Sequence, residues 1–83
     1  MGDVIVVFRI TPENMEDFAE IKNELEKLKP QRLEEEPLAF GLKAWKFTKL
    51  VPDEEGKLSE LEEKLSKIKG IQSIDIIEIS RSL

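Results

Sequence analysis

The chain has 83 residues and a net charge of −5, with 37% of its residues charged. This length allows one domain with a modest core, since a chain of this size buries roughly 60–65% of its unfolded surface. The chain has no cysteine, histidine or tyrosine, which excludes disulfides, thiolate metal sites and nucleophiles activated by histidine. The acidic balance also disfavours direct binding to the phosphates of nucleic acids.

The sequence also carries information about location. No apolar run reaches the length of a transmembrane helix. The first ten residues lack the basic start and the small-residue cleavage site of a signal peptide. We therefore expect a cytoplasmic protein that does not bind membranes.

The first segment, Asp3 to Ile10, is predicted to be a strand because β-branched residues dominate it. Apolar side chains on both of its faces indicate a central strand that is covered on at least one side. Two helix starts follow, and both stay open at this point. Either Thr11 caps a helix with Pro12 at its first position, or Asn14 caps it with Asp17 three residues on.

A helix is predicted next, because apolar residues recur at spacings of three and four until Pro30 ends the pattern. This apolar stripe consists of Phe18, Ile21, Leu25 and Leu28. The polar stretch from Gln31 to Glu36 then predicts an edge strand whose charges discourage pairing between sheets. Its three consecutive glutamates point to alternating faces, so we expect a solvated edge there and not a metal site.

The segment EPLAFGLK, residues 36–43, places an apolar loop with one aromatic residue directly before the next strand. Pro37 cannot donate to a sheet ladder, and Gly41 permits the positive φ that a tight reversal needs. Between two bends Phe40 has little room to turn inward, so we expect its ring to project outward as an anchor for a partner. The alternative is that Phe40 caps the open end of the core.

The strand predicted next runs from Leu42 to Val51, with Trp45 and Phe47 on one face at a period of two. The polar turn of residues 52–56 then separates this strand from a second helix.

The second helix has Ser59 and Glu62 at the spacing of a capping box. Its apolar stripe consists of Leu58, Leu61, Leu65 and Ile68. Gly70 stands where a glycine often ends a helix, and the β-branched residues from Ile71 to Ile79 predict a final strand.

The predicted order is strand–helix–strand–strand–helix–strand over a single domain, residues 1–83. That order is typical of the ferredoxin-like α+β fold, a four-stranded antiparallel sheet with two helices on one face. Right-handed crossovers then place the first strand and the strand containing Trp45 at the centre of the sheet. The fold hosts many functions and selects none of them.

Two functions from other classes stay open beside a partner-binding role. A small-molecule-binding regulatory module of this fold pairs sheets between copies and binds its ligand at the seam. An RNA-binding module uses aromatic residues on the sheet. Here Trp45 and Phe47 share the face expected to be core, and the first strand offers only Phe8, which disfavours RNA binding.

Four segments together resemble the archaeal elongation factor 1-beta family, guanine-nucleotide exchange factors for elongation factor 1-alpha. They are MGDVIVVFRI at residues 1–10, EEEPLAFGLKA at residues 34–44, VPDEEG at residues 51–56, and IKGIQSI at residues 68–74. The most specific element is Phe-Gly-hydrophobic-Lys at residues 40–43, because eukaryotic relatives carry it as Gly-aromatic-Gly-Ile-Lys-Lys. The whole chain is similar to the catalytic carboxy-terminal domain of those relatives.

The resemblance implies how the chain acts. It implies a factor that stabilises the nucleotide-free state of elongation factor 1-alpha, with no covalent chemistry, cofactor or metal of its own. An aromatic residue at the position of Phe40, beside Gly41 and Lys43, inserts into the GTPase. A cation near the carboxy terminus, by alignment Arg81, reaches toward the partner's magnesium and phosphate site. We expect a monomer when the protein is free.

Two departures from the family pattern bear on these roles. The second lysine after the glycine is replaced by Ala44, and Arg81 followed by two residues stands in place of a penultimate lysine. The planar guanidinium of arginine does not mimic a compact ammonium group.

Overall fold

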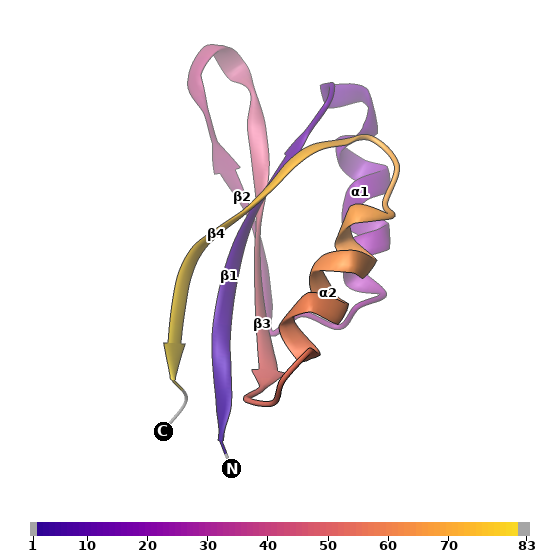
Figure 1. Cartoon of the computed structure of the whole chain (residues 1–83). Coiled ribbons are helices and arrows are strands. Elements are labelled where there is room, and N and C mark those ends of the chain that lie inside the picture. Colours follow the sequence, from indigo (N-terminus) through magenta and orange to yellow (C-terminus); the bar gives the residue numbers. More distant parts are fainter. Residues whose placement is uncertain (1, 82–83) are drawn as a thin grey trace.

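The computed structural model describes residues 2–81 and shows one antiparallel sheet with both α-helices on the same face (Figure 1). The strand order is β2-β3-β1-β4. This arrangement confirms the ferredoxin-like fold and the central positions of the first and third strands. The elements are β1 (Asp3–Pro12), the 3₁₀ turn η1 (Met15–Asp17), α1 (Phe18–Glu26), β2 (Arg32–Pro37), the 3₁₀ turn η2 (Ala39–Gly41), β3 (Lys43–Pro52), α2 (Lys57–Ser66) and β4 (Ile71–Arg81).

The chain enters its first helical segment at Asn14, which caps the 3₁₀ turn η1, and α1 itself begins at Phe18. The side-chain oxygen of Asn14 accepts a hydrogen bond of 3.1 Å from the backbone N–H of Glu16, which caps η1 and leads the chain into α1. The alternative start is wrong, because Thr11 and Pro12 pair with β4 as the last residues of β1. Asn14 is the cap because Thr11 is still part of β1, where it pairs with Ser73 of β4.

The second helix begins earlier than its sequence pattern predicts. α2 starts at Lys57 after Gly56, whose φ is +85°, so Ser59 lies inside the helix and the predicted capping box is wrong. Gly70 does not end the helix directly, because α2 stops at Ser66. Gly70 instead adopts a φ of +87° in the turn before β4, and its carbonyl accepts a 2.7 Å hydrogen bond from the N–H of Glu13.

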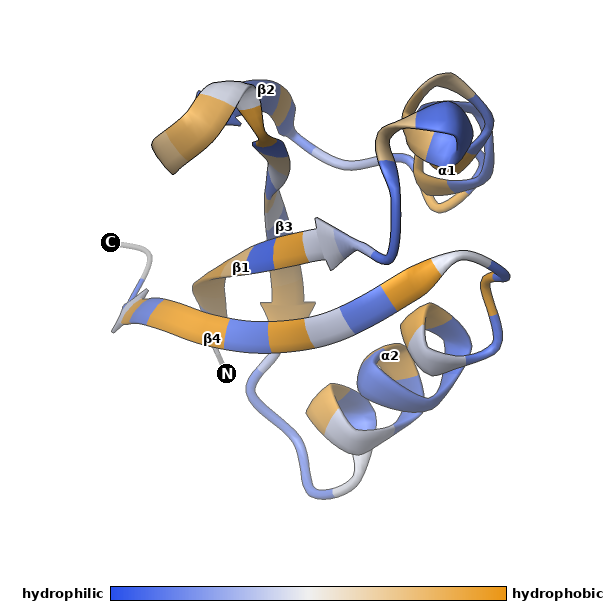
Figure 2. Cartoon of the chain, turned by 90° about the horizontal axis from the view of Figure 1, so that it is seen from above, coloured by the Kyte–Doolittle hydropathy of each residue, from blue (hydrophilic) through white to orange (hydrophobic). Residues whose placement is uncertain are grey.

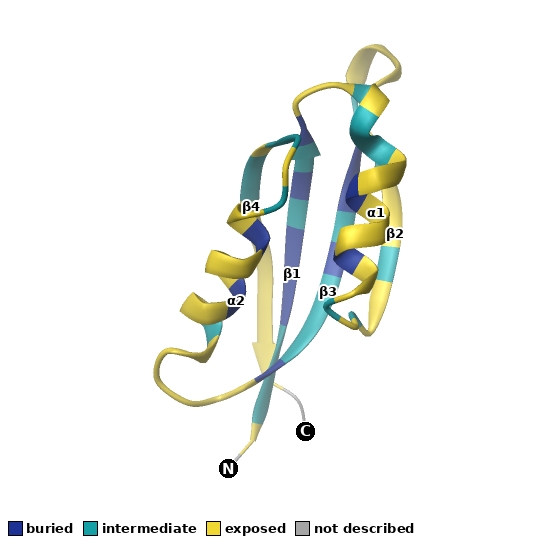
Figure 3. Ribbon diagram, turned by 90° about the vertical axis from the view of Figure 1, so that its right-hand side faces the viewer, coloured by how far each residue is buried: buried dark blue, intermediate teal, exposed yellow. Residues whose placement is uncertain are grey.

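The core lies between the helices and the sheet, with apolar residues of both helices facing the strands (Figures 2 and 3). Phe8 and Phe47 pack edge to face with ring centroids 6.0 Å apart. Trp45 stacks on Phe18 at 4.2 Å and donates its indole N–H to the carbonyl of Phe18 at 3.0 Å. The buried core residues are Val6, Phe8, Ile10, Ile21, Leu25, Trp45, Phe47, Val51, Leu61 and Leu65.

The opposite face of the sheet carries no helix, and we call it the open face (Figure 2). It is not fully exposed, since Val7 and Ala44 are buried on it by neighbouring side chains. None of the helices within residues 2–81 is long and apolar enough to cross a membrane.

Candidate partner-binding site

The loop between β2 and β3 presents Phe40 to solvent. Two backbone hydrogen bonds close its base, from Leu38 N–H to the carbonyl of Leu42 at 2.7 Å and from Leu42 N–H to the carbonyl of Ala39 at 3.2 Å. The Phe40 side chain is 99% exposed. The prediction of an outward ring is therefore confirmed, and the alternative of a ring that caps the core is wrong.

The backbone of this loop is held in an unusual conformation. Gly41 has a φ of +76°, as its position predicts, but Phe40 itself has a φ of +60°. A left-handed conformation costs a residue with a Cβ roughly 1–2 kcal/mol. The exposed ring also forgoes roughly 1.5–3 kcal/mol of burial. Neither feature stabilises the free protein, and such outliers concentrate at functional sites.

Lys43 follows the loop as the first residue of β3. Its Nζ lies 2.9 Å from Oε1 of Glu35 on β2, and both side chains are about half exposed. Leu42, half exposed beside it, extends the apolar surface of the loop. The structure thus brings Phe40, Gly41 and Lys43 together at one end of the sheet.

A second ion pair supports the base of the same loop. The Arg9 guanidinium contacts both carboxylate oxygens of Glu36, at 2.6 Å from Nε and 3.2 Å from Nη2. The hydrogen bond from Arg9 lowers the pKa of the Glu36 carboxyl below its usual value of 4.5. Sequence reasoning assigned Glu36 to a solvated edge and missed this pair. The partners are 27 positions apart and meet only once β3 lies between β1 and β2.

Arg81 lies at the other end of the sheet. It is the last residue of β4, stands opposite Val4 of β1, and its Nη1 lies 2.8 Å from Oδ2 of Asp53. Val4 also pairs with Val51 of β3, so Arg81, Val4 and Val51 lie side by side across the sheet. Val51 is eight positions from Lys43 along β3, which corresponds to roughly 26 Å. The structure therefore does not bring Arg81 and Phe40 together (Figure 1). Ser82 and Leu83, which complete the carboxy-terminal segment, lie outside the described residues.

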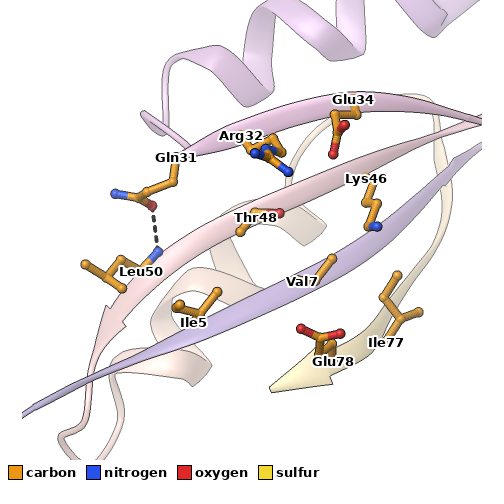
Figure 4. Close-up of a pocket in the computed structure, with 10 residues that line it drawn as sticks. All are labelled: Ile5, Val7, Gln31, Arg32, Glu34, Lys46, Thr48, Leu50, Ile77 and Glu78. Carbon is orange, nitrogen blue, oxygen red and sulfur yellow. Dashed lines mark hydrogen bonds between the residues drawn. The ribbon is translucent and has the colours of Figure 1, made fainter. Parts of the chain in front are cut away.

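Between these two ends the open face holds a shallow hollow of about 440 Å³ (Figure 4). Ile5, Val7 and Ile77 line it with apolar groups, and Arg32 and Glu78 add opposite charges. The carbonyl oxygen of the Gln31 side chain accepts a hydrogen bond of 2.6 Å from the backbone N–H of Leu50 and links the start of β2 to β3. The mixed charge selects neither an anion nor a cation.

Comparison with known proteins places this geometry in a family. Residues 5–81 match the family model described as the EF-1 guanine nucleotide exchange domain. The chain belongs to this family. The match begins in β1 and ends at Arg81, so it includes both the Phe40 loop and the far end of the sheet.

Full-length relatives agree with the family match. The chain is 39% identical to elongation factor 1-beta of Methanosarcina acetivorans, over 98% of this chain and 99% of the relative. It is 35% identical to the protein of the same name from Methanosarcina barkeri and 34% identical to that from Methanothermobacter thermautotrophicus, each over 98% of this chain. The resemblance seen in the sequence is confirmed, and the protein is a guanine-nucleotide exchange factor of translation elongation.

Proposed function

We propose that the chain releases GDP from elongation factor 1-alpha by binding its nucleotide-free state, with Phe40 inserted into the GTPase as the main anchor. The observation that carries this proposal is the fully exposed aromatic ring on a left-handed backbone. The chain acts by binding, as one exchange domain over residues 1–83, with no covalent step. It works as a monomer in the cytoplasm and binds neither nucleic acid nor membrane.

Linkage sets the size of the effect that the Phe40 loop must supply. A factor that weakens GDP binding must bind the nucleotide-free GTPase more tightly by the same factor. A thousandfold weakening corresponds to about 4 kcal/mol. One buried aromatic anchor contributes on the order of 2–4 kcal/mol, so Phe40 together with Gly41 and Lys43 is sufficient in magnitude.

Arg81 supplies a second contact in this proposal. Its guanidinium approaches the groups that the partner's magnesium ion neutralises, and Coulomb attraction favours the metal-free state. Arg81 must first leave Asp53, but an exposed ion pair of this kind is worth about 0–1 kcal/mol. The roughly 26 Å between the two ends requires a partner that extends along the whole sheet.

The two other functions find less support. Trp45 and Phe47 are buried beneath the helices and offer no stacking surface to an RNA base. The open-face hollow has mixed charge and belongs to a face that the Phe40 loop bends toward (Figure 2), which favours a protein partner over a small ligand.

The direct test is release of fluorescent GDP from elongation factor 1-alpha, measured with the wild-type chain and with Phe40→Ala. A folded Phe40→Ala variant that exchanges as fast as the wild type would refute the role of the ring.

A further inference from the structure

A second hollow, of about 310 Å³, lies on the helix side of the sheet at the end away from the Phe40 loop. Its lining comes from residues 27–29, which follow α1, from the end of β3 and from α2. Leu28, Val51 and Leu61 provide an apolar floor. We call this hollow the lysine hollow, because its lining includes Lys27, Lys29, Lys49, Lys57 and Lys64.

The charge of the lysine hollow is opposite to that of the chain. Five lysines and a single carboxylate, Glu60, line it, which gives +4 in a protein of net charge −5. Two of the five cations are paired, Lys27 with Glu24 at 2.6 Å and Lys57 with Glu60 at 3.9 Å. Within residues 2–81 the ammonium groups of the other three, Lys29, Lys49 and Lys64, form no ion pair.

Two of these lysines occupy positions that favour other residues. Lys49 lies on the core-facing side of β3 between Phe47 and Val51, where the alternation calls for an apolar residue. Lys29 has a φ of +55°, a conformation that favours glycine. The two are linked, since Nζ of Lys49 donates to the carbonyl of Lys29 at 2.9 Å. The left-handed backbone of Lys29 is unfavourable for a residue with a Cβ, and both residues leave a cation at the hollow.

We propose that the lysine hollow binds a short acidic segment of a protein, with carboxylates on the lysines and an apolar side chain on the floor. Lys29 lies in the segment that follows α1 and Lys64 lies on α2, and both line the hollow, so a segment bound in the hollow can meet both cations. A partner of the opposite charge also offsets the mutual repulsion of the five ammonium groups.

The chemistry of the hollow favours an acidic peptide over a nucleic acid. Its lining contains no aromatic side chain on which a base could stack. Its floor is aliphatic, and a nucleic acid extending beyond the hollow would meet the acidic remainder of the chain. A short peptide stays within the basic area and supplies its own apolar group.

The test uses fluorescence anisotropy of a labelled short peptide of alternating aspartate and leucine, titrated with the full chain at low and at physiological salt. Three comparison probes separate the requirements, namely the same peptide with asparagine for aspartate, the same peptide with serine for leucine, and a short oligouridine. The variant is K29Q/K64Q, which keeps the polar character of both exposed positions. Its matched control, K67Q/K69Q, removes the same charge on exposed residues outside the hollow.

We expect the aspartate–leucine peptide to bind more tightly than all three comparison probes, and K29Q/K64Q to weaken it about threefold to tenfold. K67Q/K69Q and Phe40→Ala leave this affinity unchanged, so the outcome is independent of the exchange assay. Four results would overturn the proposal: no binding, equal losses in both double variants, equal binding of the asparagine or serine peptide, or tighter binding of oligouridine. Thermal unfolding of each variant verifies the fold.

Discussion

Arg9 on β1 and Glu36 on β2 meet across the intervening strand β3, beside Ala44. In the sheet register Glu36 stands opposite Ala44 of β3. Arg9 stands opposite Lys46, which is two residues further along β3 and on the same face. Ala44 is fully buried although no helix covers the open face. The small side chain at position 44 therefore leaves room for the two-point ion pair beside it.

We expect Ala44→Lys to destabilise this chain by about 1–3 kcal/mol. The larger side chain must displace Arg9 from Glu36 or strain the sheet, and overfilling a packed site costs energy of this order. Urea unfolding measures the change. Thr48→Lys adds the same cation to the same face of β3 away from the pair, and equal losses from both variants would refute the explanation.

The Arg9–Glu36 pair also predicts a pH dependence of stability. The pKa of Glu36 is lowered in the folded state, chiefly by the hydrogen bond from Arg9. The ionised carboxylate therefore adds to the free energy of unfolding, in full, at pH values above the usual pKa of 4.5. That contribution is lost as the pH falls through the lower, folded-state pKa. Glu36→Gln should reduce the loss of unfolding free energy that the wild type shows as the pH is lowered. Urea unfolding at a series of acidic pH values measures this dependence. Glu34→Gln, on the same edge strand, serves as the control, because Glu34 forms no ion pair within residues 2–81, and it should leave that pH dependence in place.

Gly70→Ala should cost more stability than Gly56→Ala, although both glycines have nearly the same positive φ. The conformation alone costs each variant roughly 1–2 kcal/mol. At Gly56 a new Cβ meets open space, whereas at Gly70 it comes within 3.0 Å of the Asp17 side chain. Thermal unfolding of the pair isolates the contact, and losses of the same size would show that the turn relaxes away from Asp17.

Asp53→Asn should raise the exchange activity by about fivefold or less. The substitution frees Arg81 from its 2.8 Å ion pair, and such an exposed pair is worth about 0–1 kcal/mol. Arg81→Ala should lower the exchange rate while leaving the unfolding free energy within about 0.5 kcal/mol of the wild type. If neither variant changes GDP release, Arg81 takes no part in exchange.

The sequence was sufficient for the features that depend on local pattern. Alternation along β3 correctly assigned Trp45 and Phe47 to the core. The bends at Pro37 and Gly41 correctly predicted an outward Phe40. The start of the second helix was predicted wrongly. α2 begins at Lys57 without a side-chain cap, and Ser59, which the sequence pattern identified as the cap, lies inside the helix.

Features that depend on register could not be read from the sequence. The closeness of Arg9 and Glu36 requires β3 to lie between their strands at a fixed offset. The wide separation of Phe40 and Arg81 likewise follows only from the pairing of β1 with both β3 and β4. The lysine hollow collects residues from the segment after α1, from β3 and from α2, and their spacing along the chain carries no signal.

The most direct measurement is the rate at which fluorescent GDP leaves elongation factor 1-alpha in the presence of wild-type protein, Phe40→Ala or Ile79→Ala. Ile79 is a second exposed apolar residue, 54% accessible and at the far end of the sheet. We expect strong acceleration by the wild type, little change with Ile79→Ala, and a loss on the order of a hundredfold with Phe40→Ala. Because Phe40 is exposed, its variant should unfold within about 0.5 kcal/mol of the wild type. Full acceleration by a folded Phe40→Ala protein would contradict the role of the ring as the anchor of exchange.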